Sequence, residues 1–233
     1  MNNNLLLSLK LLLKNGFHFG HNVSRYNPNN KPYIFGIRNN TYIFNLEKTF
    51  QQLKRVVAFL EKNSFQKDTI LFVGTKKHVH FLTKLIAKKC NQLYIDTKWT
   101  PGILTNNSQL NTFLNNLHDL ESKIINKETL SPKELATYKK LKHKYKGLMT
   151  DNATQFGKLP QLIVVLNPDD KDGIMAINEA SQVLIPTIAL VDSDASPLNI
   201  TYPIPGNNNS IETISMFGNL VINSLNKKQN KNV

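Results

Sequence analysis

Short apolar runs alternate with longer segments of helical periodicity along most of the chain. Four short runs, apolar apart from Thr187, predict strands of a buried parallel sheet: 70–73, 93–95, 162–166 and 187–191. Apolar residues recur at every third or fourth position in the segments that predict helices: 46–63, 77–89, 173–184 and 211–225. This alternation predicts an α/β fold built on a doubly wound parallel sheet of about five strands.

The beginning of the chain follows a different pattern. Residues 5–15 predict a short helix, and residues 16–45 are interrupted by Gly, Asn and Pro, which is typical of loops. Within that region, residues 33–35 and 41–44 predict short strands. The first apolar run is too short and too polar to cross a bilayer and lacks the features of a signal or transit peptide, so we expect it in the mature protein.

Residues 107–147 interrupt the alternation, because they contain no strand candidate. A periodic apolar face predicts one amphipathic helix in the first half of this segment. Ser131 as N-cap and Pro132 at the first helical position predict a second helix, which Gly147 ends. We expect the two helices, joined by a short turn, to form an antiparallel hairpin.

The chain therefore divides into three parts. We expect residues 1–106 and 148–225 to form one α/β globular domain with a single core. Residues 107–147 are the helical hairpin inserted into it. Residues 226–233 form a polar, basic tail whose end we expect to fray.

The charge balance points to a polyanionic partner. The chain holds 29 Lys and Arg against 16 Asp and Glu, a formal net charge of +13, and its pI is near 9.7. Solubility needs a net charge of only about 2–8 on a small domain, so the excess indicates binding to a polyanion. The second hairpin helix is rich in lysine, and we expect it to contact phosphates; the alternative is an ordinary solvated face.

A doubly wound sheet also occurs in nucleotide-dependent enzymes, but this sequence lacks their motifs. Only Gly74 follows the first buried strand, and no GxGxxG, GxxxxGK[ST] or GxSxG occurs. The single cysteine, Cys90, excludes an intrachain disulfide framework, and no residue cluster predicts a metal site. We therefore predict no cofactor and no metal. The remaining enzyme hypothesis uses His18 or His21 with Asp192, which follows a strand end where α/β active sites form.

Two segments carry side chains suited to RNA. Residues 21–33 mix Arg, Lys, His, Asn and Tyr on an irregular segment, and these side chains bind phosphates, contact 2′-hydroxyls and stack on bases. The turn Gly74-Thr75-Lys76-Lys77 predicts a helix N-terminus beside two lysines, which attracts a phosphate. The alternative for that turn is a plain strand-to-helix connection in which Thr75 caps the helix.

A series of motifs, in order and spanning about residues 5–225, resembles the ribosomal protein S2 family. The motifs are Gly16-Phe17-His18-Phe19-Gly20-His21, Asn27-Pro28, Lys31-Pro32-Tyr33-Ile34, Leu46-Glu47-Lys48-Thr49, Ile70-Leu71-Phe72-Val73-Gly74-Thr75-Lys76, Lys98-Trp99-Thr100-Pro101-Gly102-Ile103-Leu104-Thr105-Asn106, Leu159-Pro160, Asn178-Glu179-Ala180, Ile185-Pro186-Thr187 and Tyr202-Pro203-Ile204-Pro205-Gly206-Asn207. The resemblance implies a flavodoxin-like parallel sheet with an inserted helical hairpin. It also implies a structural place in the small ribosomal subunit, bound to ribosomal RNA and neighbouring ribosomal proteins, without catalysis.

Within this interpretation, we expect six basic residues to contact RNA phosphates: Arg25, Lys31, Arg38, Lys76, Lys77 and Lys98. The chain also departs from the family pattern. Tyr26 stands where the family has tryptophan, and Pro101 where it has glycine. Asn208 and Asn209 replace two aspartates on which any metal or polar network at that turn would depend.

These departures and the abundance of asparagine favour an organelle ribosome. We expect a mitochondrial small subunit and an organelle-encoded chain, with a plastid or the bacterial cytoplasm as alternatives. We expect no membrane partner and no small-molecule substrate. A third hypothesis, beside the ribosomal and enzyme ones, is a scaffold whose lysine-rich hairpin binds an acidic partner protein.

Overall fold

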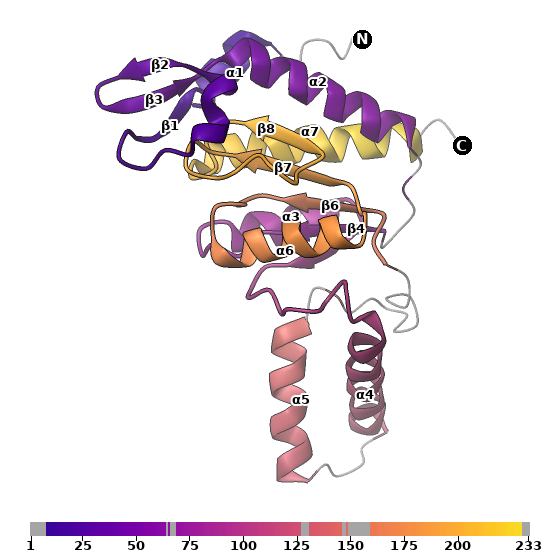
Figure 1. The fold of residues 1–233 in the computed structure, drawn as a ribbon. Coiled ribbons are helices and arrows are strands. Elements are labelled where there is room, and N and C mark those ends of the chain that lie inside the picture. The colour runs from indigo at the N-terminus through magenta and orange to yellow at the C-terminus, as the bar shows by residue number, and fades with distance from the viewer. Residues whose placement is uncertain are drawn as a thin grey trace.

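The computed structural model describes residues 8–63, 65, 69–126, 131–145, 148 and 159–229 (Figure 1). Its centre is a parallel sheet with the strand order β5-β4-β6-β7-β8. The strands are β4 (Ile70–Val73), β5 (Leu93–Ile95), β6 (Leu162–Val165), β7 (Thr187–Val191) and β8 (Tyr202–Pro205). Counted along the chain, this order is 2-1-3-4-5, which is the flavodoxin-like form of the doubly wound sheet. The predicted fold class is therefore confirmed.

The continuous apolar runs become strands that are covered on both faces. All residues of β4 and β6 are buried. Within β4, Ile70 and Phe72 pack into one hydrophobic cluster, and Leu71 and Val73 pack into another on the opposite face. This alternation explains why these strands need apolar side chains at every position.

The edge strand β8 is not predicted by the hydrophobic pattern. It contains Pro203 and Pro205, and proline lacks the N–H group that a central strand donates to its neighbour. Both prolines are accommodated because β8 lies at the edge of the sheet and pairs with β7 alone. Ile204, between them, is fully buried and ties the strand to the core.

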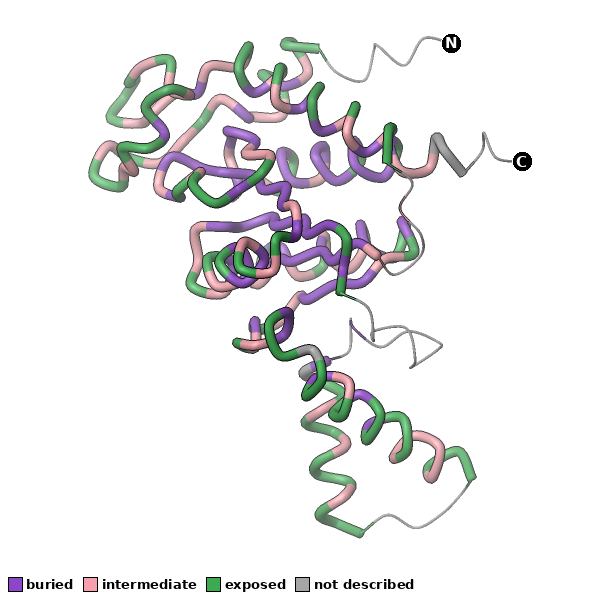
Figure 2. The backbone as a smooth tube through the Cα atoms, turned by 45° about the vertical axis from the view of Figure 1, so that its right-hand side comes forward, coloured by how far each residue is buried: buried purple, intermediate pink, exposed green. Residues whose placement is uncertain are grey.

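Helices cover both faces of the sheet (Figure 2). One face carries four helices: α1 (Leu9–Lys14), α2 (Leu46–Lys62), α3 (His80–Lys89) and α7 (Ile211–Gln229). The other face carries α6 (Lys171–Gln182) and the buried loop residues Trp99, Ile103 and Leu104. The sheet therefore lies between two hydrophobic clusters, as a doubly wound fold requires.

The N-terminal segment forms a second, antiparallel sheet. It consists of β1 (Phe19–Asn22), β2 (Ile34–Arg38) and β3 (Thr41–Phe44), in the order β1-β3-β2, with a 3-10 helix, η2 (Pro28–Tyr33), between β1 and β2. Asn39 and Asn40 connect β2 to β3 with positive φ angles of 48° and 59°, the conformation of a tight hairpin turn that asparagine tolerates. The two strands expected here are confirmed, and β1 is an addition that its polar sequence did not signal.

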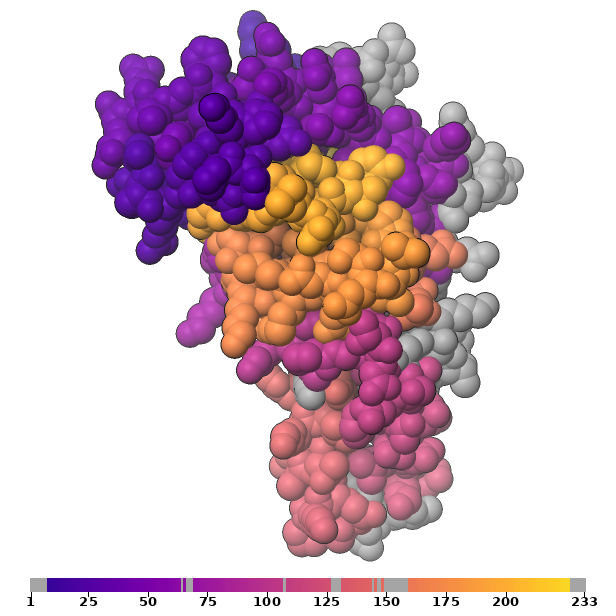
Figure 3. Space-filling view, viewed as in Figure 1, coloured from indigo at the N-terminus to yellow at the C-terminus, as the bar shows by residue number. Residues whose placement is uncertain are grey.

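Two long helices project from the sheet as a hairpin (Figures 1 and 3). These are α4 (Asn107–Ile125) and α5 (Pro132–Tyr145). The predicted cap of α5 is confirmed, because the Ser131 N–H donates to Glu134 Oε2 (2.9 Å) and the Glu134 N–H donates to Ser131 Oγ (3.3 Å), which is a capping box. Gly147, predicted to end this helix, lies outside the described residues.

The boundaries of α7 and α3 differ from the sequence predictions. Helix α7 continues to Gln229, beyond the predicted end near residue 225, and residues 230–233 lie outside the described part. Helix α3 begins at His80, later than predicted, with Val79 as its N-cap residue. The alternative in which Thr75 caps α3 is wrong, because the Thr75 hydroxyl donates to Asp170 (2.6 Å). No helix in the described ranges is long and apolar enough to cross a membrane.

Candidate nucleic-acid interface

The loop after β7 joins the parallel sheet to the N-terminal strands. The fully buried Asn30 amide donates to the carbonyl oxygens of Asp192 (3.0 Å) and Ala195 (2.7 Å). The His21 backbone N–H donates to Ser193 Oγ at 2.8 Å. Because buried polar groups are costly to leave without partners, these bonds hold the N-terminal sheet against the carboxyl edge of the parallel sheet.

His21 lies among carboxylates at this edge. Its Nδ1 is 2.9 Å from Oδ1 of the buried Asp192, and its Nε2 is 3.6 Å from Oδ2 of Asp194. The hydrogen bond with Asp192 raises the pKa of His21, and the charges of Asp194 and Asp169 add to that effect. Burial raises the pKa of the Asp194 carboxyl. The cluster therefore favours a proton on the imidazole.

Lys76 completes this network from the turn after β4. Its ammonium forms an ion pair with Asp169 and donates to Asn209 Oδ1 (3.1 Å). The Asn208 amide donates to the other oxygen of Asp169 (2.7 Å), and the Asn209 amide nitrogen lies 2.9 Å from His21 Nε2. The charge of Lys76 is thus largely compensated by partners within the protein.

In the part of the chain that the structure describes, one group has the side chains of a metal site. The ligand atoms of His21, Asp192 and Asp194 lie within 4.8 Å of one another. Both ring nitrogens of His21 already have polar neighbours, Asp192 on one side and Asn209 on the other. Asn208 and Asn209 contribute neutral amides to the network and bring no charge that would attract a cation. The absence of a metal stays a prediction.

The two histidines of the enzyme hypothesis lie in different surroundings. The structure brings His21 and Asp192 together, whereas the ring of His18 packs at a tilt of 40° against Phe19, with centroids 3.9 Å apart. Burial lowers the pKa of His18. Cys90 is buried, which raises the pKa of its thiol to about 12, so it has no nucleophilic character. The arrangement offers no support for a reaction.

A buried carboxylate, to which the sequence motif Asn178-Glu179-Ala180 assigned no role, shapes the loop after β5. Glu179 of α6 accepts hydrogen bonds from the Trp99 indole (3.0 Å), the Gly102 N–H (2.8 Å) and the Leu104 N–H (3.1 Å). Lys98 precedes this anchored loop and is exposed. The signal for Glu179 was available, because it is an acidic residue on the apolar face of a predicted helix.

The remaining predicted phosphate contacts are exposed. Arg25, Lys31 and Arg38 belong to the N-terminal sheet and its loop. Lys77 and Lys98 follow the carboxyl ends of β4 and β5. Since the loop after β7 ties the N-terminal sheet to the same edge, the candidate interface extends from the carboxyl edge onto the N-terminal sheet.

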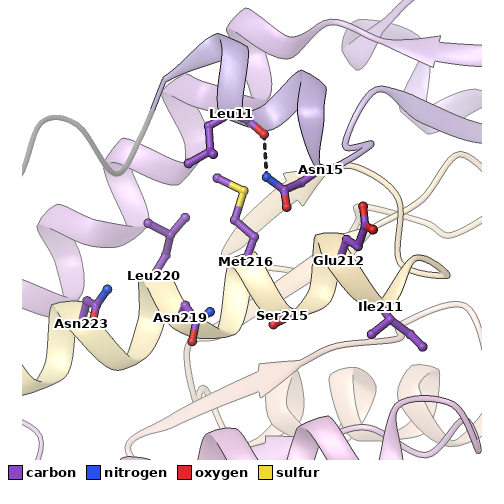
Figure 4. Close-up of a pocket in the computed structure, with 9 residues that line it drawn as sticks. All are labelled: Leu11, Asn15, Ile211, Glu212, Ser215, Met216, Asn219, Leu220 and Asn223. Atoms are coloured by element: carbon purple, nitrogen blue, oxygen red, sulfur yellow. Dashed lines mark hydrogen bonds between the residues drawn. The ribbon is translucent and has the colours of Figure 1, made fainter.

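The groove between α1 and α7 is of another kind (Figure 4). Its volume is about 440 Å³, and apolar side chains such as Leu11, Met216 and Leu220 line it. Glu212 is the only charged residue among its described lining. A groove without lysine or arginine does not attract phosphates, so it is not part of the candidate interface.

Comparison with known proteins identifies the family. The family model for ribosomal protein S2 matches residues 12–227. The small ribosomal subunit protein uS2 of Buchnera aphidicola subsp. Schizaphis graminum is 36% identical, with 97% of this chain and 93% of the relative covered. The proteins of the same name from Chlamydia muridarum (36% identical, 91% and 75% covered) and Acidiphilium cryptum (31%, 94% and 85%) are similar over most of their length. This chain therefore belongs to the ribosomal protein S2 family.

Proposed function

We propose that this chain is a structural constituent of the small ribosomal subunit, where it binds ribosomal RNA and neighbouring ribosomal proteins. The observation that carries this proposal is the family match over residues 12–227. The net charge of +13 supports it, because such an excess suits a polyanionic partner. The function is structural and not enzymatic, in keeping with the family.

We propose that the RNA contacts are Arg25, Lys31 and Arg38 on the N-terminal sheet, with Lys77 and Lys98 beyond the carboxyl edge. All five are exposed, so phosphates can reach them. Lys76, the sixth predicted contact, is ion-paired with Asp169 and therefore offers an incoming phosphate less free charge. Its part in the proposed interface is to keep the network in place as well as to bind.

The proposed organisation has three parts. Residues 1–106 and 148–225 form the globular body, residues 107–147 form a hairpin that reaches for RNA or protein neighbours, and residues 226–233 form a basic tail. The projection of α4 and α5 away from the sheet supports this division (Figure 1). The continuation of α7 to Gln229 means that the proposed tail would start within a helix.

We further propose that the ribosome to which this chain belongs is mitochondrial. The abundance of asparagine and the departures from the family motifs favour a mitochondrial ribosome. The relatives named above are bacterial, and the bacterial cytoplasm agrees with them equally well. A plastid is the third possibility.

Sedimentation tests the proposed function. A tagged full-length chain is expressed in its source cells, and the lysate, fractionated by compartment, is run through a sucrose gradient at low and moderate salt. We expect the chain to co-migrate with small-subunit RNA at both salt concentrations, and the fraction in which it does so identifies the compartment. A chain that remains at the top of the gradient, at its free mass of 26.5 kDa, contradicts the proposal.

A further inference from the structure

Helix α3 carries an exposed aromatic residue among lysines. Phe81 is 72% exposed and belongs to neither hydrophobic cluster. Three lysines stand at helical spacing from it, Lys77 four residues before, Lys84 three residues after and Lys88 seven residues after. Residues at these spacings share one side of a helix.

The buried side of the same helix shows that this stripe faces outward. Val79, Thr83 and Ile86 are buried, and they recur at the spacing of the opposite side of the helix. The His80 N–H donates to the Lys76 carbonyl (3.2 Å), which is the spacing of an α-helix. The turn before α3 therefore winds in the same sense as the helix, and the exposed Lys77 stands about one turn before Phe81.

The segment that carries the stripe contains basic residues and no acidic ones. Residues 69–95 contain no Asp or Glu, so lysine is not balanced along the strand, turn and helix. The exposed residues at the centre of the neighbouring α7, Asn219 and Asn223, are uncharged. A polyanion is thus the complementary partner for this surface.

We propose that the α3 stripe, defined by Lys77, Phe81, Lys84 and Lys88, binds an unpaired segment of RNA. The lysines contact successive phosphates, and Phe81 stacks on one base. A paired helix would keep its bases stacked on one another and leave the phenyl ring without a base, so the aromatic residue selects single-stranded RNA. This inference rests on the proposed ribosomal function and adds to it the kind of RNA that this surface takes.

Binding of the full-length chain to two RNA probes tests the inference. The probes are a 12-nucleotide oligouridylate, which is single-stranded, and a fully paired RNA duplex of the same length. We expect Phe81→Ala to weaken oligouridylate binding roughly 5-fold or more, because stacking on an aromatic ring contributes that much per base. Duplex binding should stay within about twofold of the wild-type value, and Phe81→Tyr should retain the wild-type affinity for both probes.

The lysines are tested by salt dependence. Replacing Lys77, Lys84 and Lys88 together by glutamine should reduce the slope of log affinity against log salt for oligouridylate by about 2. Phe81→Ala should leave that slope unchanged. Ile174→Ala is the matched control, because Ile174 is an exposed apolar residue (47%) on α6, across the sheet.

Two results would overturn the inference. One is a Phe81→Ala variant that binds both probes as tightly as Ile174→Ala. The other is a wild-type chain that binds neither RNA probe but binds polyglutamate, with the polyglutamate binding abolished by Phe81→Ala. That result would assign the stripe to an acidic protein. If the wild-type chain co-sediments with the small subunit and either result is found, the inference falls and the ribosomal function stands. If it does not co-sediment, the function falls, and the oligouridylate data still decide what the stripe binds.

Discussion

A single carboxylate, Glu179, fixes the geometry of the loop that leads from the sheet to the hairpin. Its two oxygens accept three hydrogen bonds, from the Trp99 indole and from the backbone of Gly102 and Leu104. Trp99 and Leu104 are themselves buried. A buried carboxylate is stabilised only when donors surround it, so this residue and its loop depend on each other.

Replacing Glu179 should therefore act on the stability of the loop and not directly on a contact with RNA. We expect Glu179→Ala to lower the free energy of unfolding by about 3 kcal/mol or more, because each buried donor left without a partner costs about 1–3 kcal/mol. Glu179→Gln keeps one acceptor oxygen, so its free energy of unfolding should lie between those of the wild type and Glu179→Ala. Urea denaturation followed by the fluorescence of Trp99, the only tryptophan, measures both.

The control for Glu179 is its exposed neighbour on α6, Asn178. Asn178→Ala should change the free energy of unfolding by no more than about 0.5 kcal/mol. If Glu179→Ala were as mild as this control, the three hydrogen bonds would not be what holds the loop.

The sequence predicted which residues have functional side chains better than it predicted which of those side chains contact one another. The sequence named His21 and Asp192 as a possible pair, and the structure brings them together. It gave no sign that Lys76 pairs with Asp169, because a lysine in a basic turn looks equally free for a phosphate. Partners so far apart along the chain are set by the fold, and the hydrophobic pattern of one sequence carries no information about which polar side chains meet.

At the scale of elements, α3 and α7 pack closely because α7 has a glycine at their contact. A Cβ atom on Gly218 would lie 2.3 Å from Cδ1 and 2.6 Å from Cγ1 of Ile86. Ile86 is itself buried in the cluster shared by the two helices. Glycine is a poor helix former, so its presence within α7 is explained by the approach of α3.

Gly218→Ala tests this packing. Helix propensity alone would favour alanine by about 1 kcal/mol, but overpacking a core typically costs about 1–3 kcal/mol. We expect a net loss in the free energy of unfolding, measured by urea denaturation, and a smaller loss in an Ile86→Val background, where one clashing methyl is gone. Asn219→Ala, at an exposed position of the same helix, should be neutral or slightly stabilising. A stabilised Gly218→Ala variant would mean that the helices separate at little cost.

The elements were predicted where their burial is uniform and missed where it is not. Strands β4 and β7 were predicted with their observed bounds, since every position is buried and all but Thr187 are apolar. Strand β8 was missed because an edge strand tolerates prolines, and β1 because it pairs through its backbone while its sequence holds Gly20 and His21. Helix α3 was predicted to begin too early, since the turn after β4 winds in the same sense as the helix.

The whole molecule offers basic residues at two separate places. Exposed cations lie on the N-terminal sheet at one end of the molecule, and the hairpin of α4 and α5, which follows the loop that carries Lys98, projects from the other (Figure 3). Composition gives the total charge but not this distribution. RNA binding at both places would make the protein a brace between two RNA segments, whereas binding at one would leave the hairpin to a protein neighbour.

The lysines of α5 distinguish these two arrangements. Lys139 and Lys140 are exposed. The Lys142 ammonium is 2.9 Å from the carboxylate of Glu121 on α4, so its charge is already paired within the protein. If the hairpin lies on RNA, replacing Lys139 and Lys140 by glutamine should reduce the slope of log affinity against log salt for small-subunit RNA by about 2, because each phosphate contact contributes about 0.9. Lys142→Gln is the matched control, and it should change this slope by less than about half of the 0.9 expected for one phosphate contact. Equal slopes for all three proteins would remove the hairpin from the RNA and favour an acidic protein as its neighbour.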